Sequence, residues 1–302
     1  MLTLRWGSAT DVGRVRTLNE DSLLAVPGLF VVADGMGGHA AGEVASQLAV
    51  AEFARLAEQA AVRAEDVAET VRRANEHILA AGAERGDRHG MGTTLTGISV
   101  VGAGQDAQGE QLAVFNVGDS RVYQVTEGQL RQLTVDHSAV QELVDAGRLT
   151  AQAARTHPRR NVVTRSLGTD PAPDADVWLV QPVAGDRFLV CSDGLTGELQ
   201  DSDIAELLGQ NPDPQAAADE LVRQAVAVGG HDNVTVVVLD VVEVLPDQAA
   251  QAAQTAQAAQ AETAALPSAE SQLPPTVTLP SAELGLPPTA PMPSPVPREV
   301  NG

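Results

Sequence analysis

Three apolar stretches of this 302-residue chain end immediately before an aspartate or one residue short of it. The aspartates are Asp34, Asp119 and Asp193, and the residues before each have the composition of a buried β-strand. A buried strand that ends in a carboxylate delivers that carboxylate to the edge of a sheet. Several carboxylates brought to one place repel one another and raise one another's pKa values. The fold must therefore supply a positive counter-charge where these strands end.

Two hydrophobic periods alternate along residues 1–245 and indicate the fold class. Apolar positions three and four apart predict amphipathic helices, whereas short apolar runs bounded by turn residues predict strands. The expected helices are 42–60, 64–82, 201–209 and 214–228. The expected strands are 23–26, 29–33, 93–101, 111–117, 121–125, 129–133, 176–181, 187–191 and 234–241, with a hairpin turn at Glu127-Gly128 and a mixed region over 138–168. Runs of strands interrupted by paired helices favour an α+β fold of antiparallel sheets with helices outside.

The charge balance excludes several classes of function. The chain has 40 acidic and 19 basic residues, all 19 of them arginine, for a net charge of −21. A surface this acidic repels phosphate backbones, which argues against nucleic-acid binding through a broad basic face. Without lysine there is no Schiff base and no lysine-containing phosphate loop. No apolar run approaches the roughly 20 residues that span a bilayer.

The composition changes near Pro246, which predicts two parts. Residues 1–245 mix apolar, charged and glycine residues like a globular catalytic domain. Residues 246–302 are rich in Ala and Gln and then in proline, with 10 of the chain's 18 prolines after residue 265. This segment has too little apolar surface to offset its ordering entropy, so we expect a disordered tail. A spacer is the favoured role for this tail, and a docking segment for polyproline-binding partners is the alternative. A single cysteine, Cys191, permits no internal disulfide, which fits a cytoplasmic protein.

Acidic residues recur beside glycine in five short stretches, and this repetition indicates a cation site. An ordinary turn is the alternative for any single Asp-Gly pair, but five such stretches at predicted strand ends make turns alone an inadequate explanation. Hard oxygen ligands without a cysteine or histidine cluster favour Mg²⁺ or Mn²⁺ over Zn²⁺. The stretches are Asn19-Glu-Asp21, Ala33-Asp-Gly-Met-Gly-Gly-His39, Gly118-Asp-Ser-Arg121, Ser192-Asp-Gly194 and Gly229-Gly-His-Asp-Asn233.

Arg16 adds evidence for phosphate chemistry. It lies four residues before Glu20 on a segment that is expected to be extended, and its guanidinium fork suits bidentate binding of phosphate oxygens. A surface salt bridge is the alternative for an isolated arginine. Beside a predicted cation site, phosphate binding is favoured.

Seven motifs in this order resemble those of the metal-dependent serine/threonine protein phosphatases, the PPM or type 2C family. They extend from about residue 5 to 241 and leave the tail uncovered. They are Arg16-Thr-Leu-Asn-Glu-Asp21, Asp34-Gly-Met-Gly-Gly-His39, Met91-Gly-Thr-Thr94, Gly118-Asp-Ser-Arg121, Asp136-His-Ser138, Ser192-Asp-Gly194 and Asp232-Asn-Val-Thr235.

The resemblance implies a four-layer α-β-β-α sandwich, two antiparallel sheets flanked by helices, with a metal cleft at one end. It implies two Mn²⁺ or Mg²⁺ ions, and a third in many bacterial members. By position, Asp34 would bridge the two ions and the Gly35 carbonyl would complete one of them. Asp193 and Asp232 would hold the other, and Asp119 would join Asp193 at the third site.

Three further residues receive roles from the resemblance. Glu20 and Asp21 would ligate the ions directly or hold waters on them, and Arg16 would bind the substrate phosphate. The family's activity would be hydrolysis of phosphoserine and phosphothreonine in proteins by direct attack of a metal-bridging hydroxide, opposing a cognate bacterial Ser/Thr kinase. Cys191 lies on a predicted buried strand, so we expect an inert thiol.

Two other functions remain open at this point. One is a regulatory phosphatase that acts on an anti-sigma-factor antagonist, and the other is a non-enzymatic metal-binding interaction protein of the same fold. Arg16 weighs against the first, because such relatives commonly lack the phosphate-binding arginine. The complete set of carboxylates weighs against the second.

The proton donor to the leaving group stays unassigned. Many eukaryotic members have histidine after the first Asp-Gly, where this chain has Met36. His39 is a candidate general acid, with a supporting role beside the ligands or simple packing at a helix start as the favoured alternatives. A water on a third ion near Asp119 competes for the role.

Residues 148–165 contain five arginines and no acidic residue. The resemblance makes this segment the flap beside the metal site. We expect Arg159 and Arg160 to bind phosphorylated protein segments, with a solvated helix face as the equally weighted alternative. The partners expected for this chain are thus phosphoproteins and a kinase, without nucleic acid or a membrane span, and the protein is expected to be a monomer.

Overall fold

Two five-stranded antiparallel sheets form the centre of the computed structural model, which describes residues 2–37, 41–84, 90–102, 109–126, 128–169 and 173–244. In spatial order, the first sheet contains β1 (Leu2–Asp11), β12 (Val234–Val244), β11 (Arg187–Cys191), β8 (Arg121–Thr126) and β9 (Gln129–Gln132). The second contains β10 (Asp176–Val180), β7 (Gln111–Val117), β6 (Leu95–Val101), β3 (Leu29–Ala33) and β2 (Ser22–Val26). A short pair, β4 (Gly35–Met36) and β5 (Gly92–Thr93), extends beyond β3.

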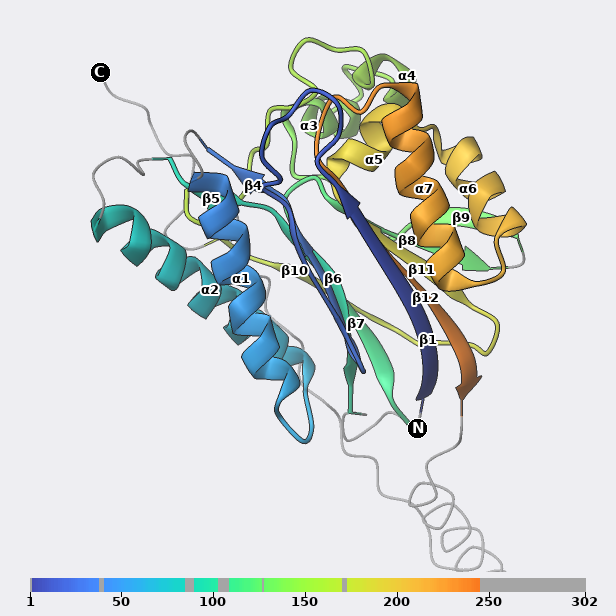
Figure 1. The fold of residues 1–302 in the computed structure, drawn as a ribbon. Helices are drawn as coiled ribbons and strands as arrows, with labels where there is room; N and C mark the ends of the chain where they lie inside the picture. The colour runs from blue at the N-terminus through green and yellow to red at the C-terminus, as the bar shows by residue number, and fades with distance from the viewer. Residues whose placement is uncertain are drawn as a thin grey trace, which may run out of the picture. The chain divides into compact units, whose positions relative to one another are not determined.

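Helices cover the outer faces of both sheets (Figure 1). The second sheet is covered by α1 (Ala41–Ala57) and α2 (Ala64–Glu84), and the first by α5 (Asp193–Glu198), α6 (Asp201–Gln210) and α7 (Pro214–Val228). Two short helices, α3 (Ala139–Asp145) and α4 (Ala151–Ala154), lie at the upper end in Figure 1. The expected four-layer α+β sandwich is confirmed. The expected tail, 246–302, lies outside the described residues.

Three apolar layers hold the sheets and helices together. In β3, Phe30 and Val32 pack between the two sheets, whereas Val31 and Ala33 pack against the helical layer of α1 and α2. A third cluster lies between the first sheet and α5–α7. Strands buried on both faces have continuous apolar sequences rather than alternating ones. This is why composition alone located most of them.

Two segments, β1 and the stretch around Arg16, differ from the sequence expectation, and α5 begins where only a strand end was expected. The edge strand β1 was not expected, because polar residues and Gly7 interrupt its apolar positions. Gly7 is required there, since a Cβ would lie 2.2 Å from Cα of Gln215 on α7. The mixed region resolves into α3, α4 and turns. The segment around Arg16, expected to be extended, is a series of turns and bends.

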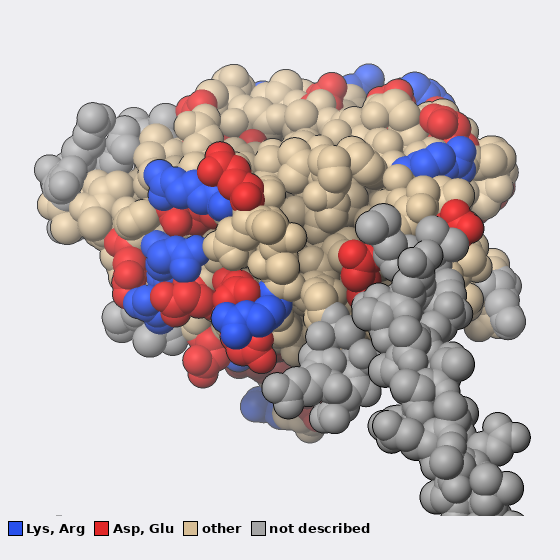
Figure 2. Space-filling model, turned by 90° about the horizontal axis from the view of Figure 1, so that it is seen from below, with Lys and Arg blue, Asp and Glu red and all other residues tan. Residues whose placement is uncertain are grey.

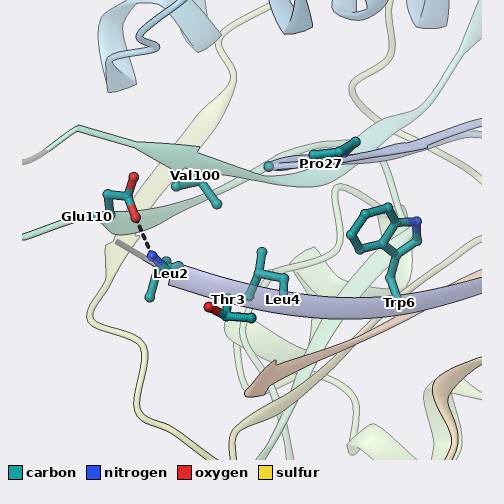
Figure 3. A pocket seen from close by; sticks show the side chains of 8 residues that line it. Leu2, Thr3, Leu4, Trp6, Pro27, Val100 and Glu110 are labelled. Atoms are coloured by element: carbon teal, nitrogen blue, oxygen red, sulfur yellow. Dashed lines mark hydrogen bonds between the residues drawn. The ribbon is translucent and has the colours of Figure 1, made fainter. Parts of the chain in front are cut away.

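The two ends of the sandwich have different chemistry. β1 and β12 run antiparallel, with Leu2 opposite Val244 at one end and Asp11 opposite Val234 at the other. At the Leu2 end a cavity of about 360 Å³ is lined mainly by apolar side chains, among them Trp6 and Val100 (Figure 3). The face seen from below carries arginines next to carboxylates around an uncharged area (Figure 2).

No helix within the described part of the chain is long and apolar enough to cross a membrane.

Candidate metal centre

The aspartates that end three apolar strands come together at the end of the sandwich away from Leu2. Asp34 lies between β3 and β4, Asp119 between β7 and β8, and Asp193 is the first residue of α5, directly after β11. By accessible area, Asp34 and Asp193 are half-buried. The protein around them nevertheless excludes enough water that desolvation has the largest effect on their pKa values. The pKa of Asp34 is raised well above its ordinary value by burial and by the negative charges of Asp21, Asp193, Asp119 and Asp232. Five aspartates therefore share one electrostatic environment.

The same two causes act on the neighbours of Asp34. Burial and the charges of Asp193 and Asp136 raise the pKa of Asp119 well above its ordinary value. Burial and the charge of Asp232 raise the pKa of Asp193, although a hydrogen bond with Asp34 works in the opposite direction. Two carboxyl groups that are hydrogen-bonded to each other share one proton, and a bound cation could replace that proton.

Asp21 shows most directly that the site lacks a partner within the protein. Ser192 Oγ donates to Asp21 Oδ2 at 2.9 Å, but Asp21 Oδ1 is buried without any hydrogen bond. Burial raises the pKa of Asp21 to about 7, against hydrogen bonds from Thr235 and Ser192 and together with the charges of Asp193 and Asp232. An unsatisfied buried carboxylate oxygen is costly. It is also a ligand atom for a hard cation.

Arg16 lies beside these carboxylates. Its NH2 is 2.7 Å from Asp232 Oδ2, and its NH1 is 4.0 Å from Glu20 Oε2. Burial raises the pKa of Glu20, while the Arg16 charge opposes that rise. The Arg16 side chain is 47% exposed. A half-exposed guanidinium at the edge of an acidic cluster can still reach a phosphate from solvent.

Asn233 positions the segment that carries Arg16 and Glu20. Its Nδ2 donates to the carbonyls of Val12 and Leu18, both at 3.0 Å, and its Oδ1 accepts from the Glu20 N–H at 2.9 Å. Sequence reasoning gave this asparagine no role. Its place directly after Asp232 was the available signal.

Two glycines beside the aspartates are required by close backbone crossings. A Cβ on Gly35 would lie 2.3 Å from the Gly42 carbonyl oxygen and 2.4 Å from that of Glu20. A Cβ on Gly194 would lie 1.9 Å from the Asn233 carbonyl oxygen. The first crossing packs the start of α1 against the Glu20 segment, and the second packs α5 against the Asp232 loop. Side chains at these positions would push the carboxylates apart.

The donor set fits a hard divalent cation, but the side chains now engage protein groups instead. In the described residues, no three His, Cys, Asp or Glu side chains are arranged to hold an ion as they stand. Asp34 shares a hydrogen bond with Asp193, Asp232 forms an ion pair with Arg16, and Asp21 accepts a hydrogen bond from Ser192. The unpartnered Asp21 oxygen and the raised pKa values show that these contacts do not compensate the negative charge.

The other expected functional residues divide into four groups. Arg155 and Arg165 are not part of an exposed patch: Arg155 donates to the carbonyls of Thr196 and Leu199, and Arg165 pairs with Asp176 at 3.0 Å. The exposed arginines of the segment are Arg148, Arg159 and Arg160. His39 lies outside the described residues. Cys191 is fully buried, which raises its pKa to about 12 and makes its thiol inert, as expected.

Comparisons with known proteins agree with this geometry. The sequence profile of the family described as Protein phosphatase 2C matches residues 14–227. The serine/threonine protein phosphatase PstP of Mycobacterium tuberculosis is 43% identical over 244 residues, 80% of this chain and 46% of that protein, so the chain spans about half the length of this curated relative. The serine/threonine phosphatase stp of Listeria monocytogenes is 35% identical over 246 residues, 76% of this chain and 93% of that protein.

A solved structure supports the same placement. The catalytic domain of PstP in complex with two manganese ions matches with a TM-score of 0.71 and 42% identity, covering 80% of this chain and 100% of that one. The family profile covers well over half of this chain, and the resemblance in the motifs is confirmed. The chain therefore belongs to the protein phosphatase 2C family.

Proposed function

We propose that this chain hydrolyses phosphoserine and phosphothreonine in proteins, using two Mn²⁺ or Mg²⁺ ions and a third at an adjacent position. The observation that carries the proposal is the group of buried, mutually repelling aspartates beside a half-exposed arginine. The PstP catalytic domain, at 42% identity, was crystallised with two manganese ions. That relative and the Listeria protein are named serine/threonine phosphatases.

The family motifs imply the proposed ligands, and the arrangement of the carboxylates supports them. Asp34, which faces the charges of four other aspartates, would be a ligand together with the Gly35 carbonyl beside it. Asp193 and Asp232 would hold the second ion, and Asp193 with Asp119 would hold the third. Glu20 and Asp21 complete the set, and the free Oδ1 of Asp21 supports this role.

The residues of this chain perform three tasks in the proposed reaction. When bound, divalent cations offset the carboxylate charge and acidify a water between them, which supplies a nucleophile near neutral pH. Arg16 binds the phosphate oxygens and stabilises the charge that develops on them. Asp232 and Glu20 hold the guanidinium in place before substrate arrives. Asn233 fixes the loop, so that Arg16 and the carboxylates keep their spacing.

No protein nucleophile is needed in this scheme. Cys191 is buried with a raised pKa. The leaving oxygen still needs a proton, and we keep His39 and a water near Asp119 as the candidate donors; if the water donates, His39 has a supporting or packing role.

We further propose that Arg159 and Arg160 bind phosphorylated protein segments. Both side chains are exposed, and no ion pair occupies them among the described residues. They lie on the segment whose ends are attached through Arg155 and Arg165 to α5 and β10. A segment fixed at both ends can present free arginines at a constant place.

The cellular setting is also a proposal. We infer a monomeric cytoplasmic enzyme that opposes a cognate Ser/Thr kinase, with residues 1–245 as catalytic domain and 246–302 as a spacer. A buried free thiol as the only cysteine supports a reducing compartment. Full activity of a chain truncated after residue 245 is the result that a spacer predicts.

The proposed activity is tested with p-nitrophenyl phosphate and a phosphothreonine peptide. Wild-type protein should hydrolyse both only when Mn²⁺ or Mg²⁺ is added, and Asp193→Asn should lose at least 100-fold in kcat/KM. Asp219→Asn, an exposed change of the same kind on α7, is the matched control and should retain activity. Hydrolysis that persists in chelator, or survives in Asp193→Asn, would refute the proposal.

A further inference from the structure

The Asp136-His137-Ser138 motif has had no function assigned so far, although the structure places it against Asp119. Asp136 accepts the Arg121 guanidinium, with Nε to Oδ1 at 2.9 Å and NH2 to Oδ2 at 2.7 Å. Ser138 caps α3 by accepting from the Gln141 N–H at 3.2 Å. His137 is turned toward the peptide that precedes Asp119.

His137 contacts Gly118 at two points. The ring Nδ1 of His137 accepts a hydrogen bond from the Gly118 N–H at 3.0 Å, and the backbone N–H of His137 donates to the Gly118 carbonyl at 2.9 Å. The side chain is only 8% exposed. Gly118 has a φ of +112°, and a Cβ there would lie 2.6 Å from the Thr94 side chain. Gly118 is thus held in a backbone conformation that favours glycine, with His137 bound to both of its polar groups and Asn116 Nδ2 also donating to its carbonyl at 3.0 Å.

These contacts fix which histidine nitrogen carries the proton. An amide N–H can only donate, so Nδ1 of His137 must be the unprotonated nitrogen. Nε2 then carries the hydrogen and donates to Asp176 Oδ2 at 3.1 Å. Asp176 Oδ1 accepts from Arg165 at 3.0 Å. Burial raises the pKa of Asp176, but the hydrogen bonds from His137 and Arg165 outweigh it and leave the pKa lowered.

A carboxylate that orients a histidine is a common supporting device in metal sites. Here the histidine binds a backbone peptide instead of an ion. The carbonyl of His137 also accepts from the Thr164 N–H at 2.8 Å, at the end of the arginine-rich segment. Asp119 therefore lies between two anchored neighbours, Gly118 held by His137 and Arg121 held by Asp136.

We propose that His137 is a positioning residue that sets the Asp119 carboxylate for a cation by clamping the Gly118 peptide, with Asp176 holding the required tautomer. This inference rests on the proposed metal-dependent function. It predicts that loss of the Nδ1 acceptor weakens the Asp119 site selectively. The two ions held by Asp34, Asp193 and Asp232 should bind as before.

Two conservative substitutions separate the clamp from general packing. The side-chain oxygen of His137→Asn lies where Nδ1 lies and can still accept from Gly118, whereas His137→Gln places its amide near Nε2 and loses that acceptor. Mn²⁺ binding is measured by isothermal titration calorimetry, with Asp119→Asn as the reference for loss of the weakest site. We expect a 10- to 100-fold weaker third site in His137→Gln and a change within about threefold in His137→Asn.

His157→Gln is the matched control, because His157 Nδ1 also accepts a backbone N–H, from Arg159 at 3.1 Å, away from Asp119. It should bind Mn²⁺ like wild type. Equal behaviour of His137→Asn and His137→Gln would overturn the inference. Should either variant fail to fold, the ¹⁵N shifts of wild-type His137 decide: hydrogen on Nε2 supports the clamp, and hydrogen on Nδ1 overturns it.

The titration also separates this inference from the proposed function. Suppose that wild-type protein binds two Mn²⁺ ions and hydrolyses phosphopeptides, but Asp119→Asn changes neither the number of bound Mn²⁺ ions nor their affinity. The positioning role of His137 is then wrong, and the proposal of a two-ion enzyme stands. If wild-type protein binds no Mn²⁺ and hydrolyses nothing, the proposed function is wrong, and the inference falls with it.

Discussion

Carboxylates on and beside β12 are compensated in two different ways. Asp240, within the strand, receives the Arg187 guanidinium through Nε at 2.6 Å and NH2 at 2.9 Å. Arg187 gives its remaining hydrogen bonds to carbonyls of Leu208, Asn211 and Pro212, so the pair is fully satisfied. Before β12 begins, the group around Asp34 has Arg16 at its edge, and the nearby Arg121 guanidinium is already paired with Asp136. The fold can therefore neutralise a nearly buried aspartate, and at the strand ends it does not.

The contrast between Asp240 and the group around Asp34 indicates where in this fold a cation would bind. A fold that satisfies Asp240 internally leaves Asp21 Oδ1 without a partner and several carboxyl groups with raised pKa values. Such unsatisfied acids are destabilising to the protein alone. They become useful once an external positive charge occupies the site. We therefore expect the proposed metal dependence to follow from how this chain distributes its arginines.

Removing the internal counter-charge should have the largest effect on stability. Arg187→Ala leaves Asp240 without its main partner, and breaking such a pair typically costs about 3–5 kcal/mol. Chemical unfolding measures the change. Arg5→Ala is the control, because Arg5 contacts the same Asp240 at 3.3 Å but is 60% exposed, so its loss should cost less than about 1 kcal/mol. Equal costs for the two variants would break the comparison.

The uncompensated group should make metal-free protein sensitive to pH. Asp21 has a folded pKa of about 7 against 3.8 for an unperturbed aspartate, so the folded state retains a proton that the unfolded chain releases. Stability should therefore fall as the pH rises from about 4 to about 7, by an amount on the order of a few kcal/mol. Melting temperatures in chelator at pH 5 and pH 8 measure this loss.

Two comparisons make the pH prediction specific. Mn²⁺ should reduce the loss of stability at pH 8, because a bound cation favours the ionised carboxylates. Asp21→Asn should reduce it without metal, because the titrating group is gone. A wild-type protein that melts at the same or a higher temperature at pH 8 than at pH 5 in chelator would contradict the account.

The exposed arginines should give the smallest effect. Reversal of Arg159 and Arg160 to Glu should lower kcat/KM for phosphopeptides about tenfold, near 1.4 kcal/mol, and leave p-nitrophenyl phosphate unaffected. Arg63→Glu, an exposed change beside the start of α2, is the control and should alter neither. Unchanged phosphopeptide kinetics after the double reversal would exclude docking by this pair.

The sequence predicted the fold best where burial on both faces imposed one pattern. β3, β6, β7, β11 and β12 are rich in apolar residues, and all were expected close to their observed bounds, although β12 continues to Val244. β1 alternates in burial and contains Gly7, so its sequence does not stand out. The six residues of α5 are too few for a helical period to appear, and its first residue, Asp193, was expected only as a strand end.

The carboxylates of the site could be predicted and their neighbours could not. Asp34, Asp119 and Asp193 follow apolar runs, and this local signal is sufficient to place them at sheet ends. Arg155 appeared to belong to a free arginine patch, because its partners are backbone carbonyls more than 40 residues away in sequence. The roles of Asn233 and His137 likewise depend on backbone groups that only the fold brings close.

The central claim is that the strand-end aspartates form a cation site. Isothermal titration calorimetry of Mn²⁺ into metal-free wild-type protein and Asp34→Asn tests it most directly. We predict at least two Mn²⁺ ions per wild-type chain and at least a 100-fold loss of affinity in Asp34→Asn, whose folding is checked by its melting temperature in chelator. Absence of Mn²⁺ binding to wild-type protein, or equal binding by a folded Asp34→Asn variant, would contradict the claim.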